Sequence, residues 1–535
     1  MQKKAWTILA IMLIATLALA GCTKPEAEKP ADEQVLTIGT PYTIETFNPF
    51  TYSSDGDRYI LSQIQESLVD STGGHHWPLL AESWTNPDNT TWVFKIRDNA
   101  YWHEGNEVYP EGANEKVTAQ DVVDVFNFVL DPANKARLQA KFEQIVESVE
   151  AVDQFTVKFV TKEPYAFFLE DINRVPIFSL KAYETLGPEK FAQFPIGTGP
   201  FKFVEYKTDD QVVLERNDAY HIKPNLDKVV FKIIPDKSVA AIALQTGEID
   251  ISLQVPPTEV DKVVSSGNAH IVPNSYGWYR YAGFNFKNPL FQDLKVRQAI
   301  KMAIDMDEAV TAIFGSETLA ERAHGPVPRG IVGWSDDWKN LSEYNPERAK
   351  ELLAEAGWKP GADGILEKDG KPFKFVLKTP NDVNRSKLGV IMATQLKQIG
   401  IDCTPQAQEW ATHLEDIRDG ATEMFIMGGG STPDGLLYMF HTEFAKGQSH
   451  NTFYDNPELD ALLDEARITV STEEREVLWE QAARMTIEDA VHVNGYNEYV
   501  QIGVANKVKG FDENPSAWLS LVSHLRNVSI DSASK

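Results

Sequence analysis

The side chains that commonly carry out catalysis form no familiar catalytic motif in this chain. We find no Gly-x-Ser-x-Gly, no His-Glu-x-x-His, no phosphate-binding Gly-Lys-Ser/Thr and no Cys-x-x-Cys. His75-His76 is an adjacent pair, and His441 and His450 lie in an expected loop region, but none has the helical spacing of metal ligands. Solvated loop histidines are therefore favoured over a nickel or zinc site. The run Gly428-Gly429-Gly430 has no following lysine and indicates a flexible or closely approached backbone.

The two cysteines have different expected roles. Cys22 ends the stretch Leu19-Ala20-Gly21-Cys22, which follows a charged start and a short apolar run. This stretch resembles the lipobox of bacterial lipoproteins, which implies cleavage before Cys22 and lipid on its thiol. The alternative is an ordinary signal peptide with an incidental cysteine. Cys403 is then alone in the mature chain, so we expect a buried small hydrophobe there rather than a disulfide or a catalytic thiol.

Charge and composition exclude some partners. The chain has 535 residues and a formal charge of −27. Removing residues 1–21 also removes Lys3 and Lys4, so the mature chain is near −27 − 2 = −29. Such an acidic body is repelled by nucleic acid, so we expect no nucleic-acid partner. No second long apolar run follows the signal, so nothing else is expected to cross a membrane.

Strand and helix patterns alternate along the chain and predict a mixed α/β fold. Residues 22–34 carry no large apolar side chain after the cysteine and are expected to form a flexible tether. Alternation predicts strands, and N-cap residues followed by apolar stripes predict helices. Alternation predicts the strand 92–97, and short β-branched runs predict strands at 156–160, 212–215 and 229–234. The predicted helices begin after Thr118, Asp293, Asn345, Asn456 and Ser471.

Aromatic residues are a possible source of ligand contacts. The chain has 12 Trp, 17 Tyr and 27 Phe, and some lie in polar surroundings, as in the stretch 276–281. Trp278 and Tyr281 in this stretch could stack on a small solute. A buried sheet face would give the same pattern, and both interpretations stay open.

Several stretches, taken in order, resemble one family, the extracellular solute-binding proteins, family 5, of peptide and nickel ABC importers. They span about 35–522. The stretches are Leu80–Trp84, Trp92–Asp98, His103-Glu104-Gly105, Val117–Val122, Pro195–Phe203, Leu214–Tyr220, Gly247–Asp250, Phe284-Asn285-Phe286, Val296–Ile300 and Ala349–Leu353. The segment 106–116 is longer than usual and is expected to be a loop insertion.

The resemblance implies a two-lobed fold of the periplasmic-binding-protein type II class, with an extra subdomain on the first lobe. The first lobe would comprise 35–75, 196–285 and, with the C-terminal tail, 500–535. The subdomain would be 76–195 and the second lobe 286–499. A monomer is expected.

The resemblance also implies a ligand cleft between the lobes. In peptide-binding members a Glu-Trp pair is followed by a Trp and an Asp that holds the peptide's amino group. Glu409-Trp410 matches the pair, whereas the later positions fall on Gly429 and Thr432. Asp434 is the nearest acid, either as a ligand contact or as a turn residue. From the first lobe we expect contacts by residues 46–54, which resemble the family's first cleft loop: Thr46, Asn48, Ser53 and Ser54.

The resemblance implies a binding protein with no cofactor and no enzymatic activity. It would be exported, held by lipid at the membrane surface and would deliver an oligopeptide to ABC permease subunits. An oligosaccharide is the first alternative ligand, because Gly429 and Thr432 replace the peptide contacts. Nickel binding and an envelope hydrolase are distant alternatives.

Overall fold

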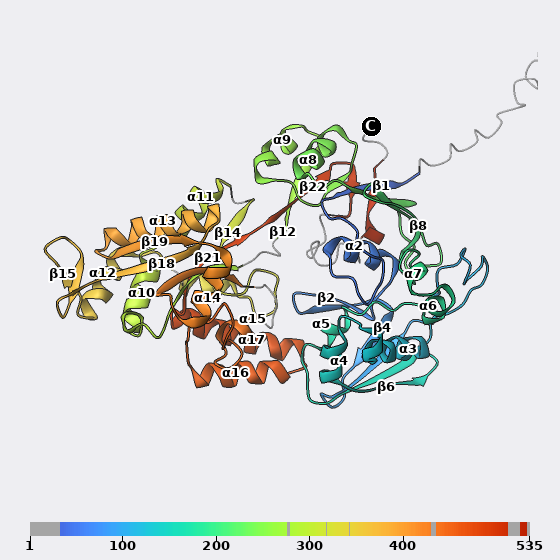
Figure 1. Cartoon of the computed structure of the whole chain (residues 1–535), viewed down its shortest axis with the longest axis horizontal. Coiled ribbons are helices and arrows are strands. Elements are labelled where there is room, and N and C mark those ends of the chain that lie inside the picture. The colour runs from blue at the N-terminus through green and yellow to red at the C-terminus, as the bar shows by residue number, and fades with distance from the viewer. Residues whose placement is uncertain are drawn as a thin grey trace, which may run out of the picture.

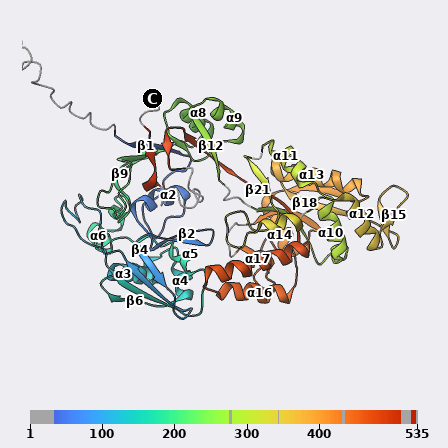
Figure 2. The same cartoon turned by 180° about the vertical axis from the view of Figure 1, so that it is seen from behind.

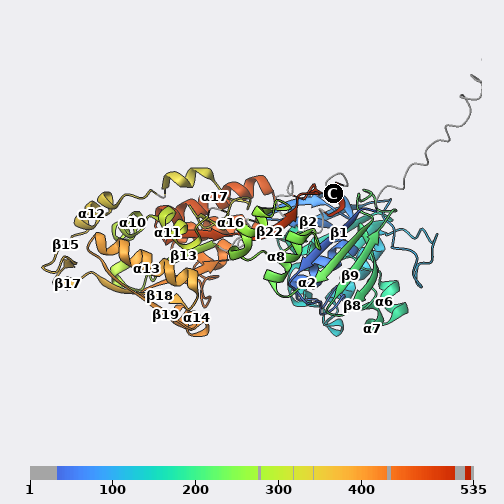
Figure 3. The same cartoon turned by 90° about the horizontal axis from the view of Figure 1, so that it is seen from above.

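The protein forms two lobes, each built around its own sheet, with a smaller subdomain on the first (Figure 1). The structure is a computed structural model and describes residues 33–274, 279–316, 318–341, 343–429, 435–511 and 525–531. Seen from above, the lobes lie end to end and β22 (Val500–Ala505) runs between them (Figure 3). The mixed α/β class predicted from the sequence is confirmed.

Lobe I contains a seven-stranded sheet in the order β12-β22-β11-β1-β10-β9-β8. Alternation in β10 places Val229, Phe231 and Ile233 in the core. The other strands are β1 (Val35–Thr40), β8 (Phe201–Lys207), β9 (Gln211–Arg216), β10 (Lys228–Ile233), β11 (Ile251–Ser252) and β12 (Ala269–Asn274); the helices are α2 (Asp55–Ile64), α8 (Lys237–Thr246) and α9 (Val260–Ser265).

The subdomain is a four-stranded antiparallel sheet in the order β4-β5-β7-β6, covered by α3 (Ala119–Leu130). Thr118 and Asp121 form the predicted capping box of α3. Residues 106–116 form the expected loop, with one isolated bridge between Tyr101 and Lys116 at its base. The remaining elements are the hairpin β2 (Val69–Thr72) and β3 (His75–Pro78), then β4 (Ala81–Thr85), β5 (Thr91–Ile96), α4 (Gln139–Ile145), β6 (Val146–Asp153), β7 (Thr156–Thr161), α5 (Phe168–Ile172), α6 (Leu180–Leu186) and α7 (Pro188–Phe191).

Lobe II contains a six-stranded sheet in the order β14-β21-β13-β20-β18-β19, with helices on both faces (Figure 2). Four helices begin at the predicted caps, Asp293, Asn345, Asn456 and Ser471. The strands are β13 (Tyr279–Phe284), β14 (Ala320–Arg322), β18 (Lys374–Pro380), β19 (Asp402–Gln408), β20 (Met424–Gly429) and β21 (His492–Glu498); the helices are α10 (Leu294–Met302), α11 (Met306–Phe314), α12 (Pro346–Glu355), α13 (Val383–Gln398), α14 (Trp410–Asp419), α15 (Gly435–Phe440), α16 (Pro457–Ile468) and α17 (Thr472–Glu488). The short strands β15 (Lys359–Pro360), β16 (Leu366–Lys368) and β17 (Lys371–Pro372) form a separate sheet.

Two connections between the described strands carry the chain from the sheet of one lobe to the sheet of the other. β12 ends at Asn274 and β13 begins at Tyr279, and β21 ends at Glu498 immediately before β22. The second passage falls at the boundary expected after residue 499. The first differs from the boundary expected at 285, because β13 pairs with β20 and β21 of lobe II. The local sequence of β13 does not specify which sheet the strand joins.

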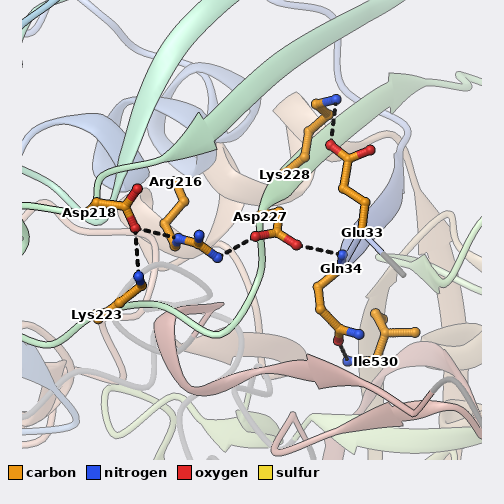
Figure 4. Close-up of polar contacts among 8 residues, drawn as sticks. All are labelled: Glu33, Gln34, Arg216, Asp218, Lys223, Asp227, Lys228 and Ile530. Carbon is orange, nitrogen blue, oxygen red and sulfur yellow. Dashed lines mark hydrogen bonds and ion pairs between the residues drawn. The ribbon is translucent and has the colours of Figure 1, made fainter. Parts of the chain in front are cut away.

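Polar contacts join the distant chain segments of lobe I (Figure 4). Arg216 lies between Asp218, at 2.8 Å, and Asp227. Asp227 accepts a hydrogen bond from the backbone N–H of Gln34 at 2.8 Å, and the Gln34 side chain accepts one from Ile530 N at 2.8 Å. The start of β1 and the C-terminal hairpin β23 (Val508–Lys509) and β24 (Ser529–Ile530) are therefore held against one lobe.

Candidate functional site

The lobe II sheet gathers several strand ends at one edge. β18 runs parallel to β19 and to β20, whereas β13 is antiparallel to β20 and β21. The ends of β18, β19, β20 and β21 therefore share this edge with the start of β13. In lobe I, β1, β10 and β11 are parallel, and β12 ends and β22 begins at their carboxyl edge. Both passages between the lobes join these two edges, where open α/β sheets commonly bind ligands.

Trp410 lies on the lobe II edge, as the first residue of α14. Glu409 caps the helix by accepting hydrogen bonds from the backbone N–H groups of Ala411 and Thr412. The Trp410 side chain is 43% exposed, and the Arg385 guanidinium lies 5.0 Å from its ring centroid. This indole is therefore accessible to a solute.

A polar network lies beside Trp410 at the same edge. Arg280, near the start of β13, contacts Glu498 at the end of β21, with Nη2 3.0 Å from Oε2. Asn384 at the start of α13 donates from Nδ2 to the other carboxylate oxygen at 3.2 Å. None of these three residues was among the predicted site residues. The one available signal was Arg280, a charged residue between two aromatic residues of a buried strand.

The two described glycines of the Gly428–430 run make room for side chains. At Gly428 a Cβ would overlap the Arg280 guanidinium, and at Gly429 it would lie 2.5 Å from Sδ of Met439. The closely approached backbone predicted for this run is thus confirmed at these two positions. Met439 of α15 takes up the space beside Gly429.

Tyr281 lies inside lobe II. Its ring stacks on His492 with centroids 3.8 Å apart, and its hydroxyl lies 3.1 Å from Nδ1 of His450. Tyr279 stacks on it at 5.1 Å, and both side chains are fully buried. The buried sheet face therefore describes these two residues, and Tyr281 has no free ring face for a solute in this arrangement.

The lobe I candidates are held by local hydrogen bonds. Thr46 Oγ1 accepts from Asn48 N at 3.0 Å, and Asn48 Oδ1 accepts from Phe50 N at 3.1 Å. Ser54 caps α2 by accepting from Asp57 N at 3.1 Å. Ser53 is exposed. The loop therefore has a defined shape, and among the four candidates Ser53 has the most open side chain.

Four predicted residues lie outside the described part of the chain: Cys22, Trp278, Thr432 and Asp434. Their roles stay predictions, as do the ligand contacts of the other candidates.

The surroundings of His76 and Cys403 disfavour the charged forms of these two side chains. Burial, followed by the Arg475 charge, lowers the pKa of His76 to about 3, and burial raises the pKa of Cys403 to about 12. Among the described residues no cluster of His, Cys, Asp and Glu has the form of a metal site. No helix within the described ranges has the length and apolar character needed to span a membrane.

Comparison with known proteins identifies the family. The model of bacterial extracellular solute-binding proteins, family 5, matches residues 77–450, and the chain belongs to this family. These proteins are extracytoplasmic binding components of ABC importers rather than enzymes, and most bind peptides.

Individual relatives cover almost the whole chain. The oligopeptide-binding protein AppA of Bacillus subtilis is 30% identical over 96% of this chain and 97% of its own length. Heme-binding protein A of Haemophilus influenzae is 28% identical over 96% and 97%. The solved structure of HbpA2 from Haemophilus parasuis superposes with a TM-score of 0.81 at 24% identity, covering 93% of this chain and 99% of that one. This last likeness supports the two-lobed type II fold.

Proposed function

We propose that this chain is the lipid-anchored binding component of an ABC importer and captures an oligopeptide between its two lobes. The observation that carries the proposal is the near full-length similarity to an oligopeptide-binding protein. The two sheet edges joined by strand passages, with the accessible Trp410 on one of them, support it. Bound peptide would then be delivered to permease subunits in the membrane.

Thermal unfolding of the purified protein with a panel of peptides tests the ligand class. A ligand at 100 times its dissociation constant adds about 2.7 kcal/mol of stability, which raises Tm by a few degrees. We expect peptides to give this shift. The proposal fails if oligosaccharides shift Tm and peptides do not.

An oligosaccharide is the second candidate ligand, favoured by the exposed indole of Trp410. In that case Trp410→Ala should weaken sugar binding by about 1–3 kcal/mol, because an aromatic anchor is lost. Phe194→Ala removes another exposed aromatic side chain, from the connection between α7 and β8, and serves as the control. Unchanged sugar affinity in Trp410→Ala would exclude the indole from the site.

Lipid attachment at Cys22 and the monomeric state complete the proposal. Mass spectrometry of the membrane-extracted protein should detect a lipidated N-terminal cysteine, and Cys22→Ser should release the protein from the membrane. Light scattering should give the mass of a single chain. A membrane-bound Cys22→Ser protein would contradict the anchor.

A further inference from the structure

A cavity of about 590 Å³ lies where the subdomain meets the edge of the lobe I sheet. Its walls come from the segment 103–111, which includes the start of the loop insertion, from the segment 186–196, from β8 and from Glu215 of β9. β8 is at the opposite end of the sheet from β12 and lies with α6 and α7 on the side of lobe I away from lobe II (Figure 1). The cavity is therefore separate from the edges that face each other between the lobes, and its volume is typical of a small-molecule site.

Apolar side chains form one part of the lining. Phe194 and Val204 are 48% and 46% exposed, although both are large and apolar. The Phe194 ring packs against Phe203 with centroids 6.0 Å apart, and the partly buried Leu186 also lines the cavity. An apolar group bound here would be stabilised because it removes this surface from water.

Carboxylates outnumber cations in the same lining. It includes four glutamates and two lysines, which gives a net charge of −4 + 2 = −2. Both lysines already have partners: Lys202 lies 3.0 Å from Glu215, and Lys190 pairs with Glu107. The excess negative charge is therefore carried by the other two glutamates.

These two glutamates are Glu104 and Glu111. Neither has a cationic partner among the residues that the structure describes. A Cβ at Gly105 would lie 3.3 Å from Oε2 of Glu111, so the loop brings this carboxylate back to the chain beside Glu104. Gly105 has φ of +87°, a conformation that suits glycine. A cationic group on a ligand would complement both carboxylates.

His103 supplies a second, independent observation. It lines the cavity and is 4% exposed. Its Nε2 donates to the carbonyl oxygen of Gly199 at 2.9 Å, so Nδ1 is an acceptor, and within the described ranges Nδ1 has no hydrogen-bond partner. Burial lowers the pKa of His103 to about 4, which keeps the ring neutral at neutral pH. A buried acceptor without a donor is costly, and an N–H group on a ligand is its complement.

We propose that this cavity binds a small organic cation in which an ammonium or amidinium group is attached to an apolar body. Glu104 and Glu111 hold the charged group, and Phe194 and Val204 contact the apolar body. The face of the Phe194 ring also attracts a cation. The inference is independent of the proposed peptide capture, because every residue that lines the cavity belongs to lobe I or the subdomain.

An NMR titration with three probes of similar shape tests the proposal at neutral pH: phenethylamine, phenethyl alcohol and hydrocinnamate. The probes are a cation, a neutral molecule and an anion that share a phenyl ring. The wild-type protein should bind the amine at least tenfold more tightly than the alcohol or the carboxylate. Methylamine lacks the apolar body and should bind at least tenfold more weakly than phenethylamine.

Two double variants locate the site. Glu104→Gln with Glu111→Gln keeps the side-chain shapes and removes both charges. It should weaken phenethylamine binding about five- to tenfold and change binding of the alcohol less than threefold. Glu82→Gln with Glu147→Gln removes two exposed carboxylates from β4 and β6 of the same subdomain and serves as the control of equal net charge. The control should bind phenethylamine within twofold of the wild type.

Each result decides the proposal. The absence of saturable phenethylamine binding to the wild type at millimolar concentration would overturn it. An unchanged affinity in Glu104→Gln with Glu111→Gln would place the amine elsewhere, and equal weakening in both double variants would indicate only an effect of overall charge; either result also overturns the proposal. A protein that binds phenethylamine as expected but binds no peptide would contradict the proposed function and leave this inference intact.

Discussion

Arg475 of lobe II contacts Glu170 of the subdomain, with Nη2 3.3 Å from Oε1. The Arg475 side chain is 1% exposed, and its Nη1 donates to the carbonyl oxygen of Ala166. Backbone bonds accompany the pair: Ala166 N donates to Arg467 O at 3.2 Å and Val332 N to Gly73 O at 2.8 Å. The lobes are thus joined on the side opposite the strand passages (Figure 1).

Replacing Arg475 should weaken this joint. Arg475→Met removes the guanidinium that contacts the Ala166 carbonyl and the mostly buried Glu170 carboxylate, so we expect a loss of about 3 kcal/mol in the free energy of unfolding. The lobes should also separate further. Urea unfolding measures the first effect, and the radius of gyration from X-ray scattering measures the second.

Arg348→Met is the matched control for this experiment. Arg348 pairs with Glu351 at 2.8 Å on the exposed surface of α12, so its replacement should leave Tm and the scattering curve unchanged. Wild-type stability and scattering in Arg475→Met would show that the contact does not hold the lobes together.

Local signals in the sequence were sufficient for many elements. Thr118, Asp293 and Ser471 cap the predicted helices because a short polar side chain can accept the orphan N–H groups of a first turn. Alternation identified β5 because period-two burial depends only on neighbouring residues, and a β-branched run identified β10.

Contacts between distant segments could not be predicted in this way. Arg280, Glu498 and Asn384 meet only through the pairing of β13 with β21 and the position of α13, and no local pattern in 280–498 encodes this meeting. Trp410 became a candidate through the family resemblance, and its exposure depends on the position of α14 at the lobe II edge, which the local sequence does not encode.

The glycines of the Pro195–Phe203 stretch permit close backbone contact. A Cβ at Gly197 would overlap the carbonyl oxygen of Ile64 and the side chain of Gln65, and Gly199 N donates to the same carbonyl at 2.8 Å. Gly197→Ala should destabilise the protein by about 3 kcal/mol or prevent folding, because a backbone atom of α2 cannot move independently. Thermal unfolding measures the effect.

A loop glycine provides the comparison for Gly197→Ala. Gly112 has φ of +80° with nothing within 4 Å of a Cβ, so Gly112→Ala should cost only about 1 kcal/mol through backbone strain. Equal losses in the two variants would argue against close packing as the role of Gly197.

Glu66 should make stability depend on pH. Burial raises the pKa of this carboxyl from 4.5 to about 7, although the hydroxyls of Tyr220 and Thr198 donate to it. Between pH 4.5 and 7 the folded state therefore holds a proton that the unfolded chain has lost. The contribution of Glu66 to the free energy of unfolding therefore falls by about 3 kcal/mol as pH rises through that window, and it is constant above the window.

Glu66→Gln isolates this contribution, because the other titrating groups are common to both proteins. Urea unfolding at pH 5 and pH 8 measures the effect. Between these two pH values the unfolding free energy of the wild type should fall by about 3 kcal/mol relative to that of the variant. Parallel pH profiles for variant and wild type would show that Glu66 titrates normally in the folded state.

Gly428 and Gly429 should tolerate alanine better than Gly197 does. Ala at 428 would displace the Arg280 guanidinium, and Ala at 429 would displace the Met439 sulfur. Each clash involves the flexible end of a side chain rather than a backbone atom, so both variants should fold with a loss of about 1 kcal/mol. Urea unfolding of the two variants beside Gly197→Ala measures the difference, and losses as large as that of Gly197→Ala would mean that Arg280 and Met439 are held as rigidly as the backbone.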